Sequence, residues 1–213
     1  MRAFVITIPI KESEQVAERC IKSAARYGVT VEPVYGVTPK DDPVKIAEDL
    51  GIPTRGFVER YSRFENCLSA FLSHHKLWSW SVDNNEEILI LEHDAYFNNE
   101  IPSNITHRGL LSLGAPSYGK YNIPKLLGVN PLQSKAYLPG AHAYIVKPEA
   151  AKVLIEKAKE FAQPTDIFLA NYNFDFIDEY YPWPVSAKDS FSTIQNAEGC
   201  HAKHNNGPGY KLL

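Results

Sequence analysis

The sequence predicts a single-domain α/β fold in which helices flank a mostly parallel central sheet. Residues 1–36 read as strand, helix and strand, which is the usual opening of a parallel sheet. Further on, an amphipathic helix leads into a nearly continuous aliphatic strand at 87–91, the pattern of a strand covered on both faces. No linker rich in Gly, Ser or Pro divides the 213 residues, so we expect one domain, 1–213.

Short local patterns predict the first elements. Residues 3–9 hold a β-branched run that proline ends, which predicts a strand. The helix that follows is expected to have Ser13 as its cap, because a serine side chain can accept from the first free N–H groups. A second strand is expected at 30–35. A short helix then begins at Pro43 and ends before Gly51, since proline suits a first helical turn and glycine follows a last one.

The later elements alternate between strong and weak patterns. Apolar residues recur on one side of 64–82, which predicts a long helix. Weak periodicity and many Asn, Pro, Gly and Ser at 95–139 predict long loops with short elements, and such loops are usually functional. A strand is expected at 143–146, followed by a helix that Pro148 opens. Thr165 is expected to cap another short helix.

Composition excludes several classes of protein. With 44% apolar and 22% charged residues, the chain has the composition of a soluble globular protein. Its three cysteines are an odd number set in helical sequence, which argues against a disulfide framework and favours a cytoplasmic protein. A net charge of -3 disfavours non-specific nucleic-acid binding, and no window approaches the roughly 18 apolar residues of a membrane span. The oligomeric state stays open.

Two carboxylates follow the aliphatic strand. Glu92 and Asp94 stand one residue apart where the chain leaves the sheet, which is where open α/β sheets bind ligands. At this spacing both can reach one hard divalent cation such as Mn²⁺ or Mg²⁺. A solvated acidic turn is the plain alternative, because short acidic patches are common.

The sequence around this pair resembles a known family. SHHKLW at 73–78 and ILILEHDA at 88–95 resemble the "SHxxLW … ILEDDA" signature of the family 25 glycosyltransferases, which include lipooligosaccharide and procollagen galactosyltransferases. The resemblance extends to three further segments, 4–8, 140–146 and 164–169. It departs at His93, which stands where the family has the middle acid, and at 9–12, which replace an arginine-bearing loop.

This resemblance implies a GT-A-like (Rossmann-like) enzyme that transfers a sugar from a UDP-sugar to an acceptor hydroxyl, with inversion. A metal would neutralise charge on the diphosphate leaving group, and a carboxylate would take the acceptor's proton. In resembling enzymes the acid equivalent to Asp166 lies on the acceptor side, so Asp166 is the first candidate for general base and Asp189 the second. The alternative for Asp166 is a structural one, since the helix dipole favours a carboxylate at a helix start.

The tail adds a separate similarity. HNNGPGYK at 204–211 is similar to the "HGNGPTK" segment of the glycosyltransferase domain of lysyl hydroxylases, although the lysine stands one residue later. The similarity implies one metal ligand and three diphosphate contacts: His204, and Asn206, Gly207 and Lys211. Glycines let backbone N–H groups approach phosphate oxygens. A mobile polar chain end is the plain alternative. A zinc site within 200–204 is disfavoured, because a structural zinc needs four protein ligands.

Two further residues carry open interpretations. Tyr35 ends the second strand, where it could stack on the uracil of a nucleotide or simply pack as a sheet tyrosine. His74 falls on the apolar face of its helix, so on chemistry alone it is expected to be a core histidine with satisfied hydrogen bonds. The family motif implies only that it lies next to the site.

The acceptor is the least determined part of the hypothesis. A saccharide is expected, because segments 118–121 and 172–183 are rich in aromatic residues that can stack on sugar faces. A hydroxylated DNA base or a protein hydroxylysine is the alternative acceptor. Two rival functions stay open: a metal-dependent phosphohydrolase, since the same side chains could activate water, and a degenerate carbohydrate-binding domain.

Overall fold

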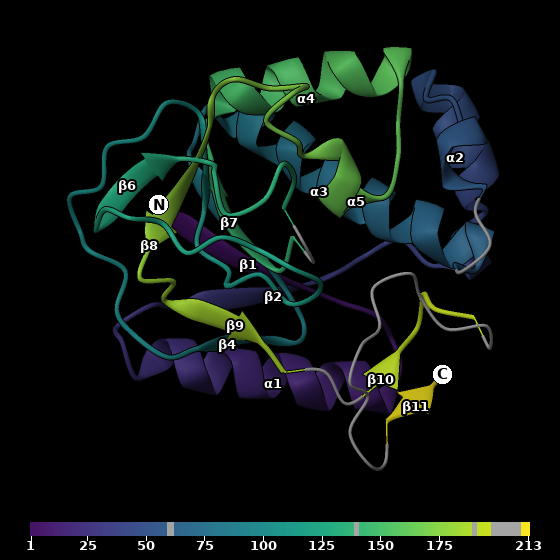
Figure 1. The fold of residues 1–213 in the computed structure, drawn as a ribbon. Coiled ribbons are helices and arrows are strands. Elements are labelled where there is room, and N and C mark those ends of the chain that lie inside the picture. The colour runs from purple at the N-terminus through teal and green to yellow at the C-terminus, as the bar shows by residue number, and fades with distance from the viewer. Residues whose placement is uncertain (59–61, 139–140, 189–190, 197–209) are drawn as a thin grey trace.

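The computed structural model describes residues 1–58, 62–138, 141–188, 191–196 and 210–213. Within them a seven-stranded sheet has the order β2-β1-β3-β7-β5-β8-β6 (Figure 1). The strands of this sheet are β1 (Arg2–Thr7), β2 (Val31–Tyr35), β3 (Ile88–Glu92), β5 (Leu110–Ser112), β6 (Gly128–Pro131), β7 (Ala143–Val146) and β8 (Ile177–Tyr181).

The sheet is mixed, with most strands parallel. β1 pairs in parallel with β2 and β3, and β5 pairs in parallel with β8. β7 is antiparallel to both β3 and β5, and β6 is antiparallel to β8. Five of the seven strands therefore share one direction, and the predicted α/β fold with a mostly parallel sheet is confirmed.

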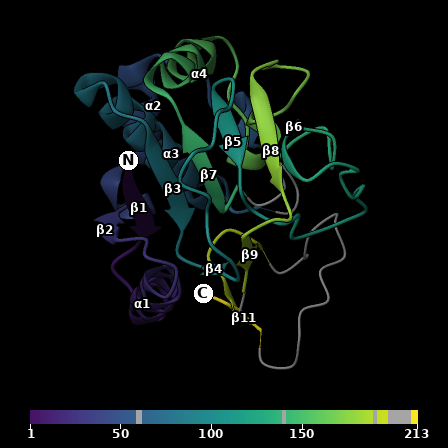
Figure 2. The same cartoon turned by 90° about the vertical axis from the view of Figure 1, so that its left-hand side faces the viewer.

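Helices cover both faces of the sheet. The α-helices are α1 (Lys11–Ala25), α2 (Pro43–Leu50), α3 (Phe64–Asn84), α4 (Pro148–Glu160) and α5 (Thr165–Phe168), and short 3-10 turns are η1 (Pro39–Asp41) and η2 (Arg55–Phe57). α1 lies on one face, whereas the other helices gather on the opposite face (Figures 1 and 2). No helix within the described ranges combines the length and apolar character needed to cross a membrane.

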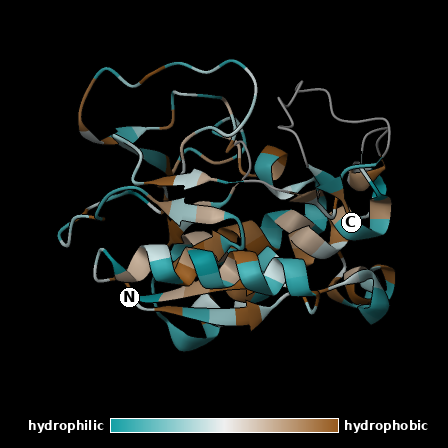
Figure 3. Ribbon diagram, turned by 90° about the horizontal axis from the view of Figure 1, so that it is seen from below, coloured by the Kyte–Doolittle hydropathy of each residue, from teal (hydrophilic) through white to brown (hydrophobic). Residues whose placement is uncertain are grey.

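The central strand β3 explains how the core is divided. Its side chains alternate between the two faces, because successive residues of a strand point to opposite sides. Ile88 and Ile90 join the cluster beneath α3 and α4, whereas Leu89 and Leu91 join the cluster that packs on α1. All four are fully buried, so the aliphatic run at this position is explained by helices on both sides. α1 shows hydrophilic residues along its outer side in Figure 3.

Two predicted helix caps are wrong. α1 begins at Lys11 after Ile10, and Ser13 lies buried in its first turn. The Ser13 hydroxyl instead accepts a hydrogen bond from the backbone N–H of Ile8 at 3.0 Å. Thr165 likewise lies inside α5, whose N-cap residue is Pro164, and no side chain caps that helix. The Ser13 hydroxyl also lies 2.8 Å from His93 Nδ1, so a tertiary contact takes the place of the local cap.

α2 matches its prediction. The Asp42 side chain accepts from the backbone N–H of Lys45, and Gly51 ends the helix with φ at +70°. Glycine adopts this left-handed conformation without steric cost.

Several short strands do not follow from the sequence pattern. β8 lies in a segment for which no strand is predicted, and further short strands follow it. β4 (Ala95–Phe97) pairs with β9 (Val185–Ala187), and β10 (Phe191–Ser192) pairs with β11 (Lys211–Leu212). These pairs lie beyond the carboxyl end of β3, so they extend the edge of the molecule at which the two carboxylates stand.

Candidate functional site

A cavity of about 710 Å³ lies at the carboxyl ends of β1 and β3. Its wall is built from segments far apart in the sequence: the loop after β2, one side of α3, the start of α5, residues 117–120 and the strand β10. The ends of parallel strands leave side chains and backbone N–H groups directed out of the sheet, which is why ligands bind there in open α/β folds.

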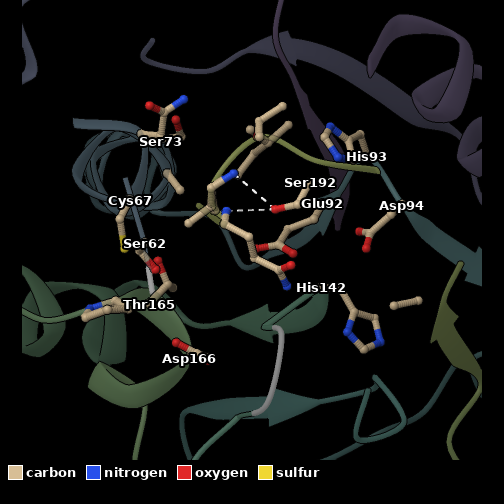
Figure 4. Close-up of a pocket in the computed structure, with 18 of the residues that line it drawn as sticks. Ser62, Cys67, Ser73, Glu92, His93, Asp94, His142, Thr165, Asp166 and Ser192 are labelled. Atoms are coloured by element: carbon tan, nitrogen blue, oxygen red, sulfur yellow. Dashed lines mark hydrogen bonds between the residues drawn. The ribbon is translucent and has the colours of Figure 1, made fainter. Parts of the chain in front are cut away.

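Three of the predicted site residues line this cavity: Glu92, Asp94 and Asp166. Glu92 is the last residue of β3, Asp94 lies in the turn before β4, and Asp166 belongs to α5 (Figure 4). Glu92 and Asp94 offer the carboxylate oxygens that hard divalent cations prefer. Within the described part of the chain, however, no three His, Cys, Asp or Glu side chains form a group that could hold a metal.

Six predicted residues remain, and the structure describes two of them, Tyr35 and Lys211. The other four are outside the described residues: Asp189, His204, Asn206 and Gly207. Tyr35 is 58% exposed, donates its hydroxyl proton to Glu14 Oε1 at 2.9 Å, and does not line the cavity. Lys211 is exposed in β11 and is the register partner of Phe191, and its neighbour Tyr210 lines the cavity. The end of the chain therefore reaches the site at Tyr210.

A buried chain of hydrogen bonds holds Glu92. The Trp78 indole N–H donates to the Tyr144 oxygen at 2.9 Å, which is also 2.9 Å from His74 Nδ1. His74 Nε2 in turn lies 3.2 Å from Glu92 Oε1. Burial lowers the pKa of His74 to about 3, so the ring is neutral.

The direction of these bonds follows from what each group can donate. Because a carboxylate can only accept, Nε2–H of the neutral His74 ring donates to Glu92, Nδ1 is then an acceptor, and the Tyr144 hydroxyl donates to Nδ1 while it accepts from Trp78. The predicted core histidine thus has a definite task, which is to orient an acid at the edge of the cavity.

Ser73 explains another position of the SHHKLW segment. Its hydroxyl accepts from the backbone N–H of Val37 at 2.8 Å and so fixes the loop after β2 against α3. A Cβ atom at Gly36 would lie 2.6 Å from the Ser73 oxygen, so only glycine allows this approach. Ser73 and His74 therefore line the cavity, whereas Trp78 acts on it only through Tyr144.

His93 stands where the family has an acid, and the structure gives it hydrogen-bonding and packing contacts. Its Nδ1 lies 2.8 Å from the Ser13 hydroxyl, and its ring centroid lies 5.3 Å from that of Phe191. It also lines the cavity. His93 therefore links the start of α1 and the strand β10 to the turn that carries Asp94.

His142 is a cavity residue that sequence reasoning did not single out. Its backbone oxygen accepts from the Glu92 N–H at 3.0 Å, and its imidazole lines the cavity near Asp94 (Figure 4). A Cβ atom at Gly114 would lie 2.5 Å from His142 Nε2, so the ring lies directly against the glycine backbone. No local sequence pattern predicts this contact, because Gly114 follows β5 and His142 precedes β7.

Aromatic residues and a lysine surround Asp166. The Tyr118 hydroxyl donates to Asp166 Oδ2, and the Ile167 N–H donates to Oδ1 at 2.9 Å. Lys135 Nζ donates to the Tyr118 backbone oxygen at 2.8 Å and lies 4.6 Å and 4.9 Å from the ring centroids of Tyr118 and Tyr137. Burial, and then the charge of Asp166, raise the pKa of Tyr118, so its hydroxyl stays a donor. Of these partners, only Tyr118 fell in a segment that its aromatic content had singled out.

Replacing Tyr144 by Phe is expected to lower the free energy of unfolding by about 2–4 kcal/mol, because it removes the hydroxyl partner of two buried nitrogen atoms. Urea unfolding curves measure this. Tyr172→Phe is the matched control, since Tyr172 is exposed and should change stability by less than about 0.5 kcal/mol. Equal stability of the two variants would contradict the proposed hydrogen-bond chain.

His75 gives an expected dependence of stability on pH. Its ring is buried, Nε2 has no partner among the described residues, and burial lowers its pKa to about 4. The unfolded chain, with a histidine pKa of about 6.5, therefore binds this proton first. The stability that the neutral His75 ring contributes is fully present above a pH of about 6.5. Below that pH, the free energy of unfolding falls by about 1.4 kcal/mol per pH unit towards pH 4. Urea unfolding at several pH values should show a flatter profile for His75→Phe; an unchanged slope would contradict the assignment.

Comparison with protein families gives a match over part of the chain. Residues 29–114 match the family described as Glycosyltransferase family 25 (LPS biosynthesis protein). The matched region contains β2, α3 and β3, and with them Glu92 and Asp94, but it ends before Asp166. The match supports the expectation of a sugar-transferring enzyme, a glycosyltransferase, over this part of the chain.

Other comparisons add little. The chain is similar to a crystal structure of a mutant Drosophila β-1,4-galactosyltransferase 7 in complex with manganese, UDP-Gal and xylobiose, with 14% sequence identity and a TM-score of 0.35. The similarity covers 72% of this chain and 52% of that one, so the chain spans about half the length of that structure. A likeness this weak carries no argument about the site. No curated protein matches the chain.

Proposed function

We propose that this glycosyltransferase uses a UDP-sugar and a divalent metal, and that it transfers the sugar with inversion to a hydroxyl of a saccharide. One observation carries the proposal: Glu92 and Asp94 at the end of β3, and Asp166 from α5, line a single cavity. Transfer to a hydroxyl needs charge neutralisation at the leaving diphosphate and a base at the acceptor, and carboxylates on two sides of one cavity can serve these two needs.

The donor side is proposed to contain Glu92 and Asp94. Their oxygens suit Mn²⁺ or Mg²⁺, and His204, which lies outside the described residues, is the proposed third ligand. When bound, the cation would neutralise the charge that builds on the leaving diphosphate. His74 keeps the Glu92 carboxylate in one orientation, which lowers the cost of ordering it when the donor arrives.

The end of the chain is proposed to contact the diphosphate through Asn206, Gly207 and Lys211. The position of Tyr210 in the cavity wall supports this proposal, because Lys211 is the next residue. Backbone N–H groups at a glycine and a lysine ammonium are suitable partners for phosphate oxygens. The predicted stacking of Tyr35 on uracil gains no support from the cavity wall, which it does not join.

Asp166 is proposed to act as the general base. The acceptor oxygen would attack the anomeric carbon while its proton passes to an Asp166 oxygen, and the bond from that carbon to the diphosphate would break on the opposite face. The hydrogen bonds from Tyr118 and the Ile167 N–H hold the carboxylate for this step. The rings of Tyr118 and Tyr137 support a saccharide acceptor, since aromatic faces stack on sugars. Asp189 stays the second candidate for the base.

Ligand-dependent stability tests the donor assignment. We expect UDP and UDP-sugars to raise the melting temperature when Mn²⁺ is present and to have little effect with a chelator, whereas ADP- and GDP-sugars should not stabilise the protein. A ligand at a hundred times its Kd should add about 2.7 kcal/mol to the free energy of unfolding. Stabilisation by UDP that does not depend on metal would contradict the proposed role of Glu92 and Asp94.

A further inference from the structure

An exposed apolar segment lies outside the cavity, between β5 and the first residues of β6. We call residues 121–129 the apolar loop. Ile123, Leu126 and Leu127 are 63%, 69% and 77% exposed, and Tyr121 and Val129 at its ends are exposed as well. β6 is an edge strand of the sheet, and in Figure 2 the chain around it projects beyond this edge. A cluster of large apolar side chains on the surface marks an interaction site more often than single exposed residues do.

Hydrogen bonds fix the apolar loop in this outward position. The Asn122 backbone N–H donates to the Ser134 oxygen at 2.8 Å, which ties the start of the loop to the segment after β6. The Asn130 side chain donates to the Leu126 oxygen at 3.0 Å and so closes its end. The leucine side chains are therefore presented to solvent by a turn whose two ends are both anchored.

The charge around the loop identifies the kind of partner. Lys120 directly precedes the apolar loop, and Lys125 lies within it. The sequence contains no Asp or Glu from 101 to 148. Such a surface is complementary to an anionic one. Two copies of the loop packed together would bring like charges close to each other, which disfavours self-association through this face.

Aromatic residues stand at the base of the loop. The Tyr121 ring packs edge-on against Trp183 at 5.8 Å, and Trp183 packs against Tyr181 at 5.0 Å. Aliphatic side chains at the tip, lysines beside them and Tyr and Trp at the base are the residues that proteins use at the boundary between water and a lipid bilayer.

We propose that the apolar loop docks the protein on the surface of an anionic phospholipid bilayer. Residues 117–120, which lead directly into the loop, line the cavity, and Tyr118 among them is bonded to Asp166. Docking would thus bring the Asp166 side of the cavity to the membrane surface, where the sugar part of a lipid-linked acceptor lies. This last step rests on the proposed function, but the docking itself does not.

Vesicle co-sedimentation of the full chain tests the docking without any need for activity. We expect binding to vesicles of equimolar phosphatidylcholine and phosphatidylglycerol, much weaker binding to phosphatidylcholine alone, and weakening as salt rises. The double variant L126S/L127S should lose about tenfold or more in partition coefficient, because both side chains insert. Lys125→Gln should weaken binding to anionic vesicles and reduce its salt dependence.

The matched control is Val153→Ser on α4, which removes an exposed apolar side chain elsewhere and should bind vesicles as the unmodified protein does. Equal vesicle binding by L126S/L127S and the unmodified protein would overturn the proposal. A second result would also overturn it. If the unmodified protein does not bind vesicles and light scattering shows a dimer that L126S/L127S converts to monomer, the loop is a contact between copies. If the unmodified protein binds vesicles but does not bind a UDP-sugar, that result counts against the proposed function alone.

Discussion

Replacing Asp94 by Asn is expected to lower the rate of sugar transfer by about a thousandfold and to leave the fold intact. Asp94 lies in the turn after β3 and lines the cavity, so the substitution removes a negative charge from the proposed donor side. Its backbone oxygen accepts from the Lys188 N–H at 2.9 Å, and that bond does not depend on the side chain. The neutral amide is a much poorer ligand for a hard cation than a carboxylate.

Isothermal titration calorimetry with UDP in the presence of Mn²⁺ measures the binding part of this prediction, and circular dichroism measures the fold. Asp83→Asn serves as the control, because it makes the same chemical change at an exposed position near the end of α3. We expect the control to bind and turn over normally. Normal UDP affinity in Asp94→Asn would contradict the assignment of Asp94 to the metal.

The second large effect is expected for Asp166→Asn. Loss of a general base reduces kcat by roughly 10²–10⁴-fold, whereas donor affinity should stay unchanged because Asp166 lies on a different element from Glu92 and Asp94. The amide oxygen can still accept from the Ile167 N–H, and the amide NH₂ group can donate to the Tyr118 oxygen, so the local structure should persist.

Steady-state kinetics and UDP calorimetry on the same preparation separate the two effects. Tyr118→Phe is the companion variant. It removes a hydrogen bond to the carboxylate but keeps the carboxylate itself, so kcat should fall by less than in Asp166→Asn while transfer continues. Full transfer by Asp166→Asn would move the role of base to Asp189.

The elements that could be predicted are those whose pattern is local. β3 was predictable because burial on both faces demands an uninterrupted aliphatic run, and α2 because Asp42 and Gly51 supply both of its ends. The cap predicted at Ser13 is wrong because its hydroxyl bonds with Thr7 of β1, with the N–H of Ile8 and, far along the chain, with His93. No pattern around Ser13 contains that information.

β8 shows a second way in which local reasoning fails. It contains Asp178 and Glu179, both buried, which do not fit the apolar composition expected of a central strand. Arg108 pairs with Asp178, and the N–H groups of Gln133 and Ser134 donate to Glu179, so these compensating partners are remote in sequence, whereas Trp183, which also donates to Glu179, is near. A buried charge is tolerated only with such partners.

The same distinction applies to the candidate site. Glu92 and Asp94 could be singled out because they directly follow an identifiable strand, and Asp166 because of a resemblance. His142 could not, since it is defined by its packing against Gly114, and Tyr118 stands out only as part of an aromatic segment and not as a partner of Asp166. Side chains that meet across the sheet edge leave no fixed spacing in the sequence.

The most direct test of the central claim is mass spectrometry of the products formed from a UDP-sugar, a saccharide acceptor and Mn²⁺. The account predicts an acceptor heavier by one sugar residue and one UDP released for each transfer, with both products lost in Asp94→Asn and when a chelator is added. Release of inorganic phosphate or free sugar with no glycosylated acceptor would contradict it, because the cavity would then activate water and the chain would act as a hydrolase.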